Sequence, residues 1–393
     1  MSKWKMVRLG DVCIIERGGS PRPIQNYITS SDDGINWIKI GDTIPNSMYI
    51  TNTKEKIISE GLKKSRFVHK GDFLLSNSMS FGRPYILEID GCIHDGWLLI
   101  RDGKNSFDKK FLYYYLSSSS TYLTFQSLAV GGVVNNLNSE MVRNLVVPLP
   151  PLDEQKRIAD VLDKASELIK KRKEQIRLMD ELAKSLFIEM FGDPVENPMG
   201  WEIKLLGELG AFKNGINYGQ KDTGYLAKIL GVGDFKSQNV FDNIDSLSSV
   251  RLTEKPNPEY FLNDGDIIFV RSNGSKELVG RNIIIYPRGK LVTFSGFCIR
   301  FRVLSSHILP SYLQNILLIP SQKSRLLENG RGCNIQNLNQ QMLSSINIPL
   351  PPLELQKAFV NRIEAIEQQK ALLQEGIAKM ETAYKALMQE YFG

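Results

Sequence analysis

Two stretches of the chain carry hydrophobic residues at alternating steps of four and three positions over many turns. In the first stretch the periodic positions run from Ile158 to Met190, and in the second from Phe359 to Tyr391. Alternating steps of four and three are typical of a coiled-coil seam. The pattern therefore predicts two long helices, over residues 152–191 and 353–392, that can pair antiparallel along their seams.

Each seam is interrupted once by a charged residue, which is Arg172 in the first helix and Lys370 in the second. One interpretation is a side chain at the edge of the seam that extends its charge into water. The other is a polar pair that sets the register of the two helices at some cost in stability. The sequence leaves both interpretations open.

Shorter runs with a high content of β-branched and aromatic residues precede each long helix, separated by Gly, Asn and Asp turns. Such runs are typical of strands. A short helix is expected around residues 113–116, and another around residues 312–317. The expected fold class is therefore α+β, with two mixed α/β domains separated by two long antiparallel coiled-coil helices.

The second half of the chain repeats the first. NLVVPLPPLDEQKRI recurs as SINIPLPPLELQKAF, so that Pro349 follows Pro148 by 201 positions. An N-L-N tripeptide and a Phe-Gly pair return at the same interval, and further upstream Gly96-Trp97 aligns with Gly296-Phe297. A period near 200 residues is too long for a solenoid and indicates two homologous halves. We expect four segments, which are a first domain at residues 1–147, a first helix at 148–192, a second domain at 193–348 and a second helix at 349–393.

The composition of this 393-residue chain, with 42% hydrophobic and 23% charged residues, is typical of a globular protein. No apolar run reaches the ~18 residues of a membrane span, and the N-terminal sequence lacks the apolar region of a signal peptide. A cytoplasmic protein with no membrane partner is therefore expected. Four cysteines without a C-x-x-C motif and only three histidines argue against a zinc site or a disulfide scaffold. The net charge of +6 permits a nucleic-acid partner without requiring one.

Common catalytic signatures are missing from the sequence. It contains no phosphate-binding G-x-x-x-x-G-K-[ST], no H-E-x-x-H, no G-x-S-x-G and no amino-methyltransferase [DNS]-P-P-[YFW] tetrapeptide. His94-Asp95 stands alone, and we interpret it as a structural or surface pair. We therefore expect a non-catalytic chain with no catalytic residue, metal or cofactor of its own.

Polar, glycine-rich loops recur at three matched places in the two halves. Arg, Lys, Ser, Asn and Gln on such loops can contact phosphates and base edges, and glycine lets the backbone approach closely. For any single loop a plain turn is the simpler interpretation, but the recurrence of all three favours DNA binding. The candidate DNA-binding residues are Ser20, Arg22, Asn77, Ser80, Arg83, Asn135, Asn217, Tyr218, Arg271, Asn273, Lys276, Arg281, Arg331 and Asn334.

The repeat, the L-P-P-L-x-x-Q-K entry to each long helix and the Phe-Gly exits resemble the specificity (S) subunit of type I restriction–modification systems. The resemblance covers nearly the whole chain. It implies that each mixed domain is a target recognition domain that reads one half of a bipartite site in double-stranded DNA. It also implies that the helices dock two methyltransferase (M) subunits, which use S-adenosylmethionine to methylate adenine at N6. Restriction (R) subunits would add cleavage with ATP and Mg²⁺.

Two other functions remain open at the level of sequence. A two-headed coiled-coil scaffold without DNA specificity would fit the mild charge and would show no salt-dependent DNA binding. An enzyme of unrecognised type would turn over a substrate without another subunit. The helices also carry hydrophobic residues off the seam, at Leu168, Leu178 and Leu182, that are free to contact a partner.

Overall fold

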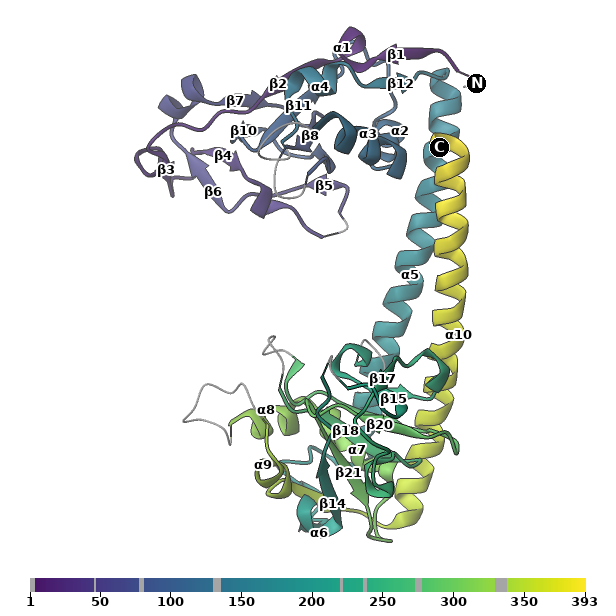
Figure 1. Ribbon diagram of the computed structural model, residues 1–393. Coiled ribbons are helices and arrows are strands. Elements are labelled where there is room, and N and C mark those ends of the chain that lie inside the picture. Colours follow the sequence, from purple (N-terminus) through teal and green to yellow (C-terminus); the bar gives the residue numbers. More distant parts are fainter. Residues whose placement is uncertain are drawn as a thin grey trace. The chain divides into compact units, whose positions relative to one another are not determined.

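The computed structural model describes residues 4–45, 47–77, 81–129, 136–219, 222–235, 239–272, 278–328 and 338–393. The chain forms two compact units. Unit 1 comprises Met1–Lys173 and Glu375–Gly393, and unit 2 comprises Glu174–Gln374. Each unit therefore holds one mixed domain together with parts of both long helices (Figure 1). In the part of the chain that the structure describes, no helix is long and apolar enough to cross a membrane.

Unit 1 contains two five-stranded sheets and one two-stranded sheet. The strand orders are β2-β11-β8-β9-β5, β3-β6-β4-β10-β7 and β1-β12. The strands are β1 Met6–Arg8, β2 Ile14–Arg17, β3 Ile28–Thr29, β4 Ile35–Ile38, β5 Tyr49–Ile50, β6 Glu55–Ile57, β7 Arg66–Val68, β8 Phe73–Ser76, β9 Pro84–Leu87, β10 Gly91–Ile93, β11 Trp97–Arg101 and β12 Val146–Pro148. The short helices are α1 Leu9–Val12, α2 Lys109–Leu116, α3 Ser119–Ala129 and α4 Ser139–Arg143.

Unit 2 repeats this topology with one smaller sheet. The strand orders are β14-β21-β18-β19-β16, β17-β15-β20 and β13-β22. The strands are β13 Glu202–Leu205, β14 Gly210–Asn214, β15 Leu226–Leu230, β16 Val240–Phe241, β17 Ser249–Arg251, β18 Asp266–Val270, β19 Asn282–Ile285, β20 Val292–Phe294, β21 Cys298–Val303 and β22 Asn347–Leu350. The short helices are α6 Leu206–Leu209, α7 Pro310–Leu318, α8 Pro320–Glu328 and α9 Gln340–Ser344. The predicted α+β fold with two homologous halves is confirmed.

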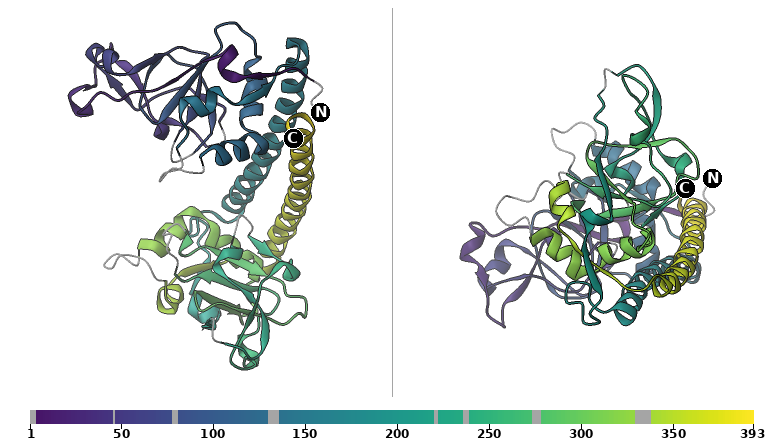
Figure 2. Two further views of the ribbon diagram at one scale, coloured as in Figure 1. Left: turned by 45° about the horizontal axis from the view of Figure 1, so that its top comes forward. Right: turned by 90° about the horizontal axis from the view of Figure 1, so that it is seen from below.

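The long helices are α5, Leu152–Phe191, and α10, Leu353–Phe392, which confirms both predicted spans. They lie side by side within each unit (Figures 1 and 2). In unit 1 the first part of α5 pairs with the last part of α10, where Lys173 Nζ lies 2.7 Å from Glu381 Oε1. In unit 2 the last part of α5 pairs with the first part of α10, where the Phe187 and Phe359 rings lie 5.5 Å apart. In each unit the pairing is therefore antiparallel.

The end of each long helix completes a hydrophobic core. In unit 1 Phe392 is buried and packs against the Phe111 ring of α2 at 5.5 Å between centroids. In unit 2 Phe191 is buried against Tyr312 of α7 at 4.9 Å. The phenylalanines of the repeated Phe-Gly endings are thus core residues, and unit 1 depends on Phe392 for its packing.

The charged seam residue of α10, Lys370, is buried and forms an ion pair. Lys370 has a 3% exposed side chain, and its Nζ lies 2.6 Å from Asp180 Oδ1 and 2.8 Å from Glu367 Oε1. Arg172 is only half-buried, as expected for a side chain at the seam edge. Lys370 is therefore buried and does not lie at the seam edge, and its partner on α5 is Asp180. Its role in setting the register stays a prediction.

Most residues of the repeated motifs support the fold. The aspartates of two repeated Gly-Asp pairs, Gly71-Asp72 and Gly265-Asp266, form ion pairs with an arginine on the neighbouring strand of the same sheet, β11 in unit 1 and β21 in unit 2. Asp72 accepts from Arg101 Nε at 2.9 Å, and in the second half Asp266 accepts from Arg302 Nε at 2.8 Å. The second asparagine of each N-L-N is a helix N-cap, since Asn138 and Asn339 accept from backbone amides three residues on.

The glutamine of L-P-P-L-x-x-Q joins the start of each long helix to the mixed domain. Gln155 is fully buried, accepts from Asp108 N at 2.8 Å and donates to Ser106 O at 3.1 Å. Gln356 makes the same pair of bonds with Leu309 N at 2.9 Å and His307 O at 2.9 Å. Each glutamine therefore satisfies backbone groups just before a short helix, α2 in unit 1 and α7 in unit 2, which explains why it recurs.

Candidate nucleic-acid interface

In unit 1 the predicted polar loops meet at one turn, residues 94–96, between β10 and β11. The loop after β2 reaches it through Gly18 N, which donates to Trp97 O at 2.9 Å. The loop after β8 begins at Asn77, whose amide donates to Gly96 O at 3.0 Å. The third loop ends at Leu137, whose amide donates to Asn77 O at 3.1 Å. Backbone hydrogen bonds thus gather three sequence-distant loops.

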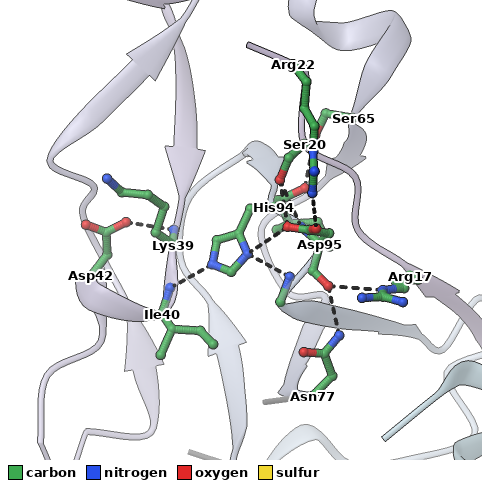
Figure 3. Close-up of polar contacts among 12 residues, drawn as sticks. Arg17, Ser20, Arg22, Lys39, Ile40, Asp42, Ser65, Asn77, His94 and Asp95 are labelled. Carbon is green, nitrogen blue, oxygen red and sulfur yellow. Dashed lines mark hydrogen bonds and ion pairs between the residues drawn. The ribbon is translucent and has the colours of Figure 1, made fainter. Parts of the chain in front are cut away.

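Asp95 is the centre of the side-chain contacts at this turn (Figure 3). Its carboxylate accepts from Ser20 Oγ at 2.8 Å and from Arg22 Nη2 at 3.2 Å. Its backbone carbonyl accepts from Arg17 Nε at 3.1 Å and from Asn77 Nδ2 at 2.8 Å. The hydrogen bond from Ser20 is the main cause of a lowered pKa at the Asp95 carboxyl, so the carboxylate is charged at neutral pH. The cluster therefore presents two arginines and a hydroxyl held by Asp95, with Arg22 and Ser20 on its carboxylate and Arg17 on its backbone carbonyl.

His94 belongs to the same turn, and its ring lies close to two backbone amides. Ile40 N lies 3.1 Å from its Nε2, and Gly96 N lies 2.7 Å from its Nδ1. A neutral imidazole accepts at one ring nitrogen only, so His94 can accept from only one of these two amides at a time. Burial lowers the pKa of His94. The interpretation of His94 as structural fits this geometry, whereas its neighbour Asp95 belongs to the loop cluster.

Unit 2 builds the same frame with other side chains. Gly215 N donates to Cys298 O at 3.1 Å, and Arg271 N donates to Phe297 O at 2.8 Å. Leu338 N donates in turn to Arg271 O at 2.8 Å. The loops of unit 2 therefore meet at residues 295–297, between β20 and β21, as those of unit 1 meet between β10 and β11.

The side chains on this second frame differ from those of unit 1. Asn217 and Tyr218 are exposed beside the turn, and Arg271 is half-exposed. A Cβ added at Gly296 would come within 1.9 Å of Asn217 Oδ1, so a larger residue at this position of the turn would displace the exposed Asn217 side chain. Phe297 is also exposed, at 61%. Unit 2 thus offers an amide, a phenol, a guanidinium and an apolar ring.

The hydrogen-bond frame changes one sequence alignment. Trp97 pairs with Ser76 across the sheet, as Cys298 pairs with Val270. The residue before each accepts a backbone hydrogen bond. In unit 1 Gly96 O accepts from Asn77 N after β8, and in unit 2 Phe297 O accepts from Arg271 N after β18. Gly96 is therefore equivalent to Phe297, and the sequence alignment of Gly96 with Gly296 was wrong by one residue.

A Gly-Arg pair follows the loop after β8 in unit 1, as Gly82-Arg83, and the loop after β18 in unit 2, as Gly280-Arg281. Each pair lines a cavity. Arg83 is exposed and lines an open pocket of about 720 Å³ with Tyr113 and Tyr122. Arg281 lines a pocket of about 470 Å³ with Lys184 and Lys323. Burial lowers the pKa of Arg281. The assignment of both arginines to DNA stays a prediction.

The predicted DNA-binding residues fall into three groups, of which Arg83 and Arg281 at the two cavities form one. The structure brings Ser20, Arg22 and Asn77 together in unit 1, and Asn217, Tyr218 and Arg271 in unit 2. Asn77 is 2% exposed, and its side-chain amide donates to the backbone carbonyl of Asp95. It therefore supports the turn from inside instead of facing solvent. The predicted residues outside the described part of the chain are Ser80, Asn135, Asn273, Lys276, Arg331 and Asn334.

Sequence reasoning missed Arg17, Asp95 and Phe297. The signal for Asp95 was its place between the β-rich runs GCI and WLLIR, where a short turn presents its residues beside the strand ends. Phe297 was hidden because the alignment gave it the place of Trp97, which is a buried core residue.

Comparison with known proteins places these features in a family. A family model described as the type I restriction modification DNA specificity domain matches residues 1–178 and 198–382. The putative type I restriction enzyme MjaX specificity subunit of Methanocaldococcus jannaschii is 27% identical, over 98% of this chain and 92% of its own length.

Two solved structures share the fold. The type I restriction–modification S subunit from M. genitalium aligns with a TM-score of 0.55 at 16% identity, over 100% of this chain and 96% of its own. A chain from a study of complex assembly and conformational transition of the type I R-M system aligns with a TM-score of 0.60 at 19% identity, over 99% and 97%.

Proposed function

The chain belongs to the family of type I restriction–modification DNA specificity domains, and on this basis we propose how it divides DNA recognition between its two units. The chain is the non-catalytic DNA-recognition subunit of such a system. In the proposal, the loop cluster of unit 1 reads one half of a bipartite DNA site and that of unit 2 reads the other.

One observation carries this proposal. The same backbone hydrogen bonds hold both loop clusters, whereas the side chains at equivalent positions differ. Asn77 is replaced by Arg271 and Gly96 by Phe297 on the same frame. A constant frame with variable side chains is what two readers of different sequences need, because backbone contacts position a protein on DNA and side chains at base edges specify the sequence.

In unit 1 the proposed contacts to DNA come from Arg17, Ser20 and Arg22. Arg22 is the best placed, because its side chain is exposed while one of its amino groups is fixed on Asp95. In unit 2 they come from Asn217, Tyr218 and Arg271, which can serve adenine edges, phosphates and guanine edges respectively. The candidates outside the described residues remain proposed contacts on the same three loops. Residues 1–147 and 193–348 are the proposed recognition domains, and residues 148–192 and 349–393 the proposed spacer helices.

The proposed protein partners are two methyltransferase (M) subunits, joined by restriction (R) subunits where cleavage occurs. The M subunits would bring S-adenosylmethionine for adenine-N6 methylation, and the R subunits ATP and Mg²⁺. Leu178 and Leu182 are exposed on α5 one turn apart, which makes an apolar surface outside the seam. We assign the contact with an M subunit to this surface.

Binding-site selection from random duplex DNA tests the DNA-reading role. The subunit in complex with its adenine methyltransferase should enrich one two-part sequence, and the methyltransferase alone should enrich none. The affinity for that sequence should fall steeply with salt, because phosphate contacts release counterions. Enrichment of no sequence would favour the alternative of a scaffold without DNA specificity.

A further inference from the structure

Phe297 has an unusual position for a phenylalanine. Among the residues that the structure describes, it is the one phenylalanine with a largely exposed side chain. It lies on the turn between β20 and β21, and its carbonyl accepts from Arg271 N at 2.8 Å. An exposed aromatic ring contributes little to folding but gains free energy when a partner covers it. Its position therefore points to contact with whatever binds the loop cluster of unit 2.

The fold itself does not require a ring at this position. The equivalent residue of unit 1 is Gly96, which receives the same backbone hydrogen bond, from Asn77 N. Trp97 and Cys298, the next residues of the two units, are both buried in their cores. The ring of Phe297 is thus an addition to a frame that folds without it, and it distinguishes unit 2 from unit 1.

The neighbours of Phe297 are polar groups suited to base edges. The amide of Gly296, the preceding residue, donates to Ile216 O at 2.8 Å, so the loop that carries Asn217 and Tyr218 lies directly against the turn. In the major groove Asn complements adenine and Arg complements guanine, whereas apolar side chains complement the C5-methyl group of thymine. Phe297 is the apolar member of an otherwise polar set.

We propose that Phe297 contacts the C5-methyl group of a thymine in the half-site that unit 2 reads. The inference rests on the proposed DNA-reading role and names one base for one side chain. It predicts that unit 2 discriminates thymine from uracil at one position, whereas the equivalent turn position of unit 1, Gly96, makes no such contact.

The test uses the full subunit in complex with its methyltransferase and the site found by selection. Each thymine of the unit 2 half-site is replaced in turn by deoxyuridine, which removes only the methyl group. One replacement should weaken binding about four-fold, the equivalent of about 0.8 kcal/mol for one buried methyl group. Phe297→Gly should bind the thymine duplex about four-fold or more weakly and no longer distinguish uracil at that position. Phe297→Leu, which keeps an apolar side chain, should retain part of the discrimination.

Leu304→Ala is the matched control. Leu304 is an exposed apolar residue of the same unit, but it follows the last residue of β21, whereas Phe297 precedes the first residue of that strand. Its replacement should leave both the affinity and the response to deoxyuridine unchanged.

Several results would overturn the inference while leaving the DNA-reading role intact. These are a unit 2 half-site without thymine, wild-type binding that no deoxyuridine changes, or a Phe297→Gly variant that still distinguishes uracil. An equal loss on thymine and uracil duplexes would instead indicate a ring inserted between bases. Absence of any sequence-specific binding by the wild-type complex would contradict the DNA-reading role itself.

Discussion

Lys370 Nζ lies 2.6 Å from Asp180 Oδ1 in the seam between α10 and α5, with the lysine side chain almost completely buried. Burial lowers the pKa of Lys370, but the hydrogen bonds that it donates to Asp180 and Glu367 outweigh this effect, and the net pKa is raised. A raised pKa means that the pair contributes fully below the ordinary lysine value of about 10.4 and loses its contribution only as the pH rises above it. At neutral pH the pair is therefore intact.

Asp180→Ala should destabilise unit 2. The substitution leaves a buried lysine with Glu367 as its remaining partner, and loss of a hydrogen bond to a charged group costs about 1.5–3 kcal/mol. The free energy of unfolding, measured by denaturant titration, should fall by that amount. The control is Glu381→Ala, which removes an exposed pair with Lys173 and should change the free energy by less than about 1 kcal/mol. Equal effects of the two substitutions would contradict the assigned importance of the buried pair.

Asp95→Asn should weaken recognition by unit 1 alone. The substitution keeps the size of the side chain but removes the charge that fixes Arg22 and reduces the bond with Ser20. Discrimination between bases of the unit 1 half-site should fall by about 1–3 kcal/mol at one position, as measured with single-base variants of the duplex. Discrimination in the unit 2 half-site should not change. A loss spread over both half-sites would indicate a general defect of folding or assembly.

Acid should destabilise unit 1 through His94. Burial lowers the pKa of His94 in the folded state, so the unfolded chain binds its proton more readily. The stability that the neutral ring provides is present above the ordinary histidine value of about 6.5 and is lost as the pH falls below it. Thermal unfolding of the wild type and of His94→Gln should show a steeper loss between pH 7 and pH 5 for the wild type. Parallel pH profiles for the two proteins would contradict this.

Leu182→Glu, combined with Leu178→Glu, should abolish co-purification with the methyltransferase. Both side chains are exposed, so the substitutions should leave the unfolding transition of the free subunit nearly unchanged. Leu304→Glu provides the control, since it adds a charge at an exposed apolar residue of unit 2 outside the helices. Deletion of most of α5 would be a poorer test, because it would remove Ile158 from the core of unit 1 and Phe187 from the core of unit 2. Retention of the methyltransferase by the double variant would place the docking surface elsewhere.

The sequence predicted the elements whose signal is repeated. The bounds of both long helices followed from the seam period, and the two-fold repeat indicated two similar domains before any strand was placed. It could not show that α5 ends in the core of unit 2 and α10 in the core of unit 1, because the burial of Phe187 and Phe392 depends on tertiary contacts with α7 and α2. It also could not identify the ion-pair partner of Lys370, since Asp180 lies 190 positions away.

The loop cluster was predictable in outline and not in detail. Glycine-rich polar loops repeated at matched places indicated a site, but the turn that joins them is different in the two halves. Asp95 has no charged equivalent in unit 2, so the repeat gave no signal for it. The residue type of Asn77 favours a base contact, whereas the backbone turn around it buries the side chain and gives it a supporting role.

The proposal that each unit reads one half of the DNA site is tested most directly by exchanging residues 1–143 for the corresponding domain of another specificity subunit. The long helices and residues 193–393 stay unchanged, so the surface assigned to the methyltransferase is retained. The measurement is the methylated adenine motif in cells that carry the hybrid and its methyltransferase, determined by sequencing the methylated genome. The account predicts a motif in which one half is new and the other half is identical to that of the parent. A motif altered in both halves, or unchanged in both, would contradict it.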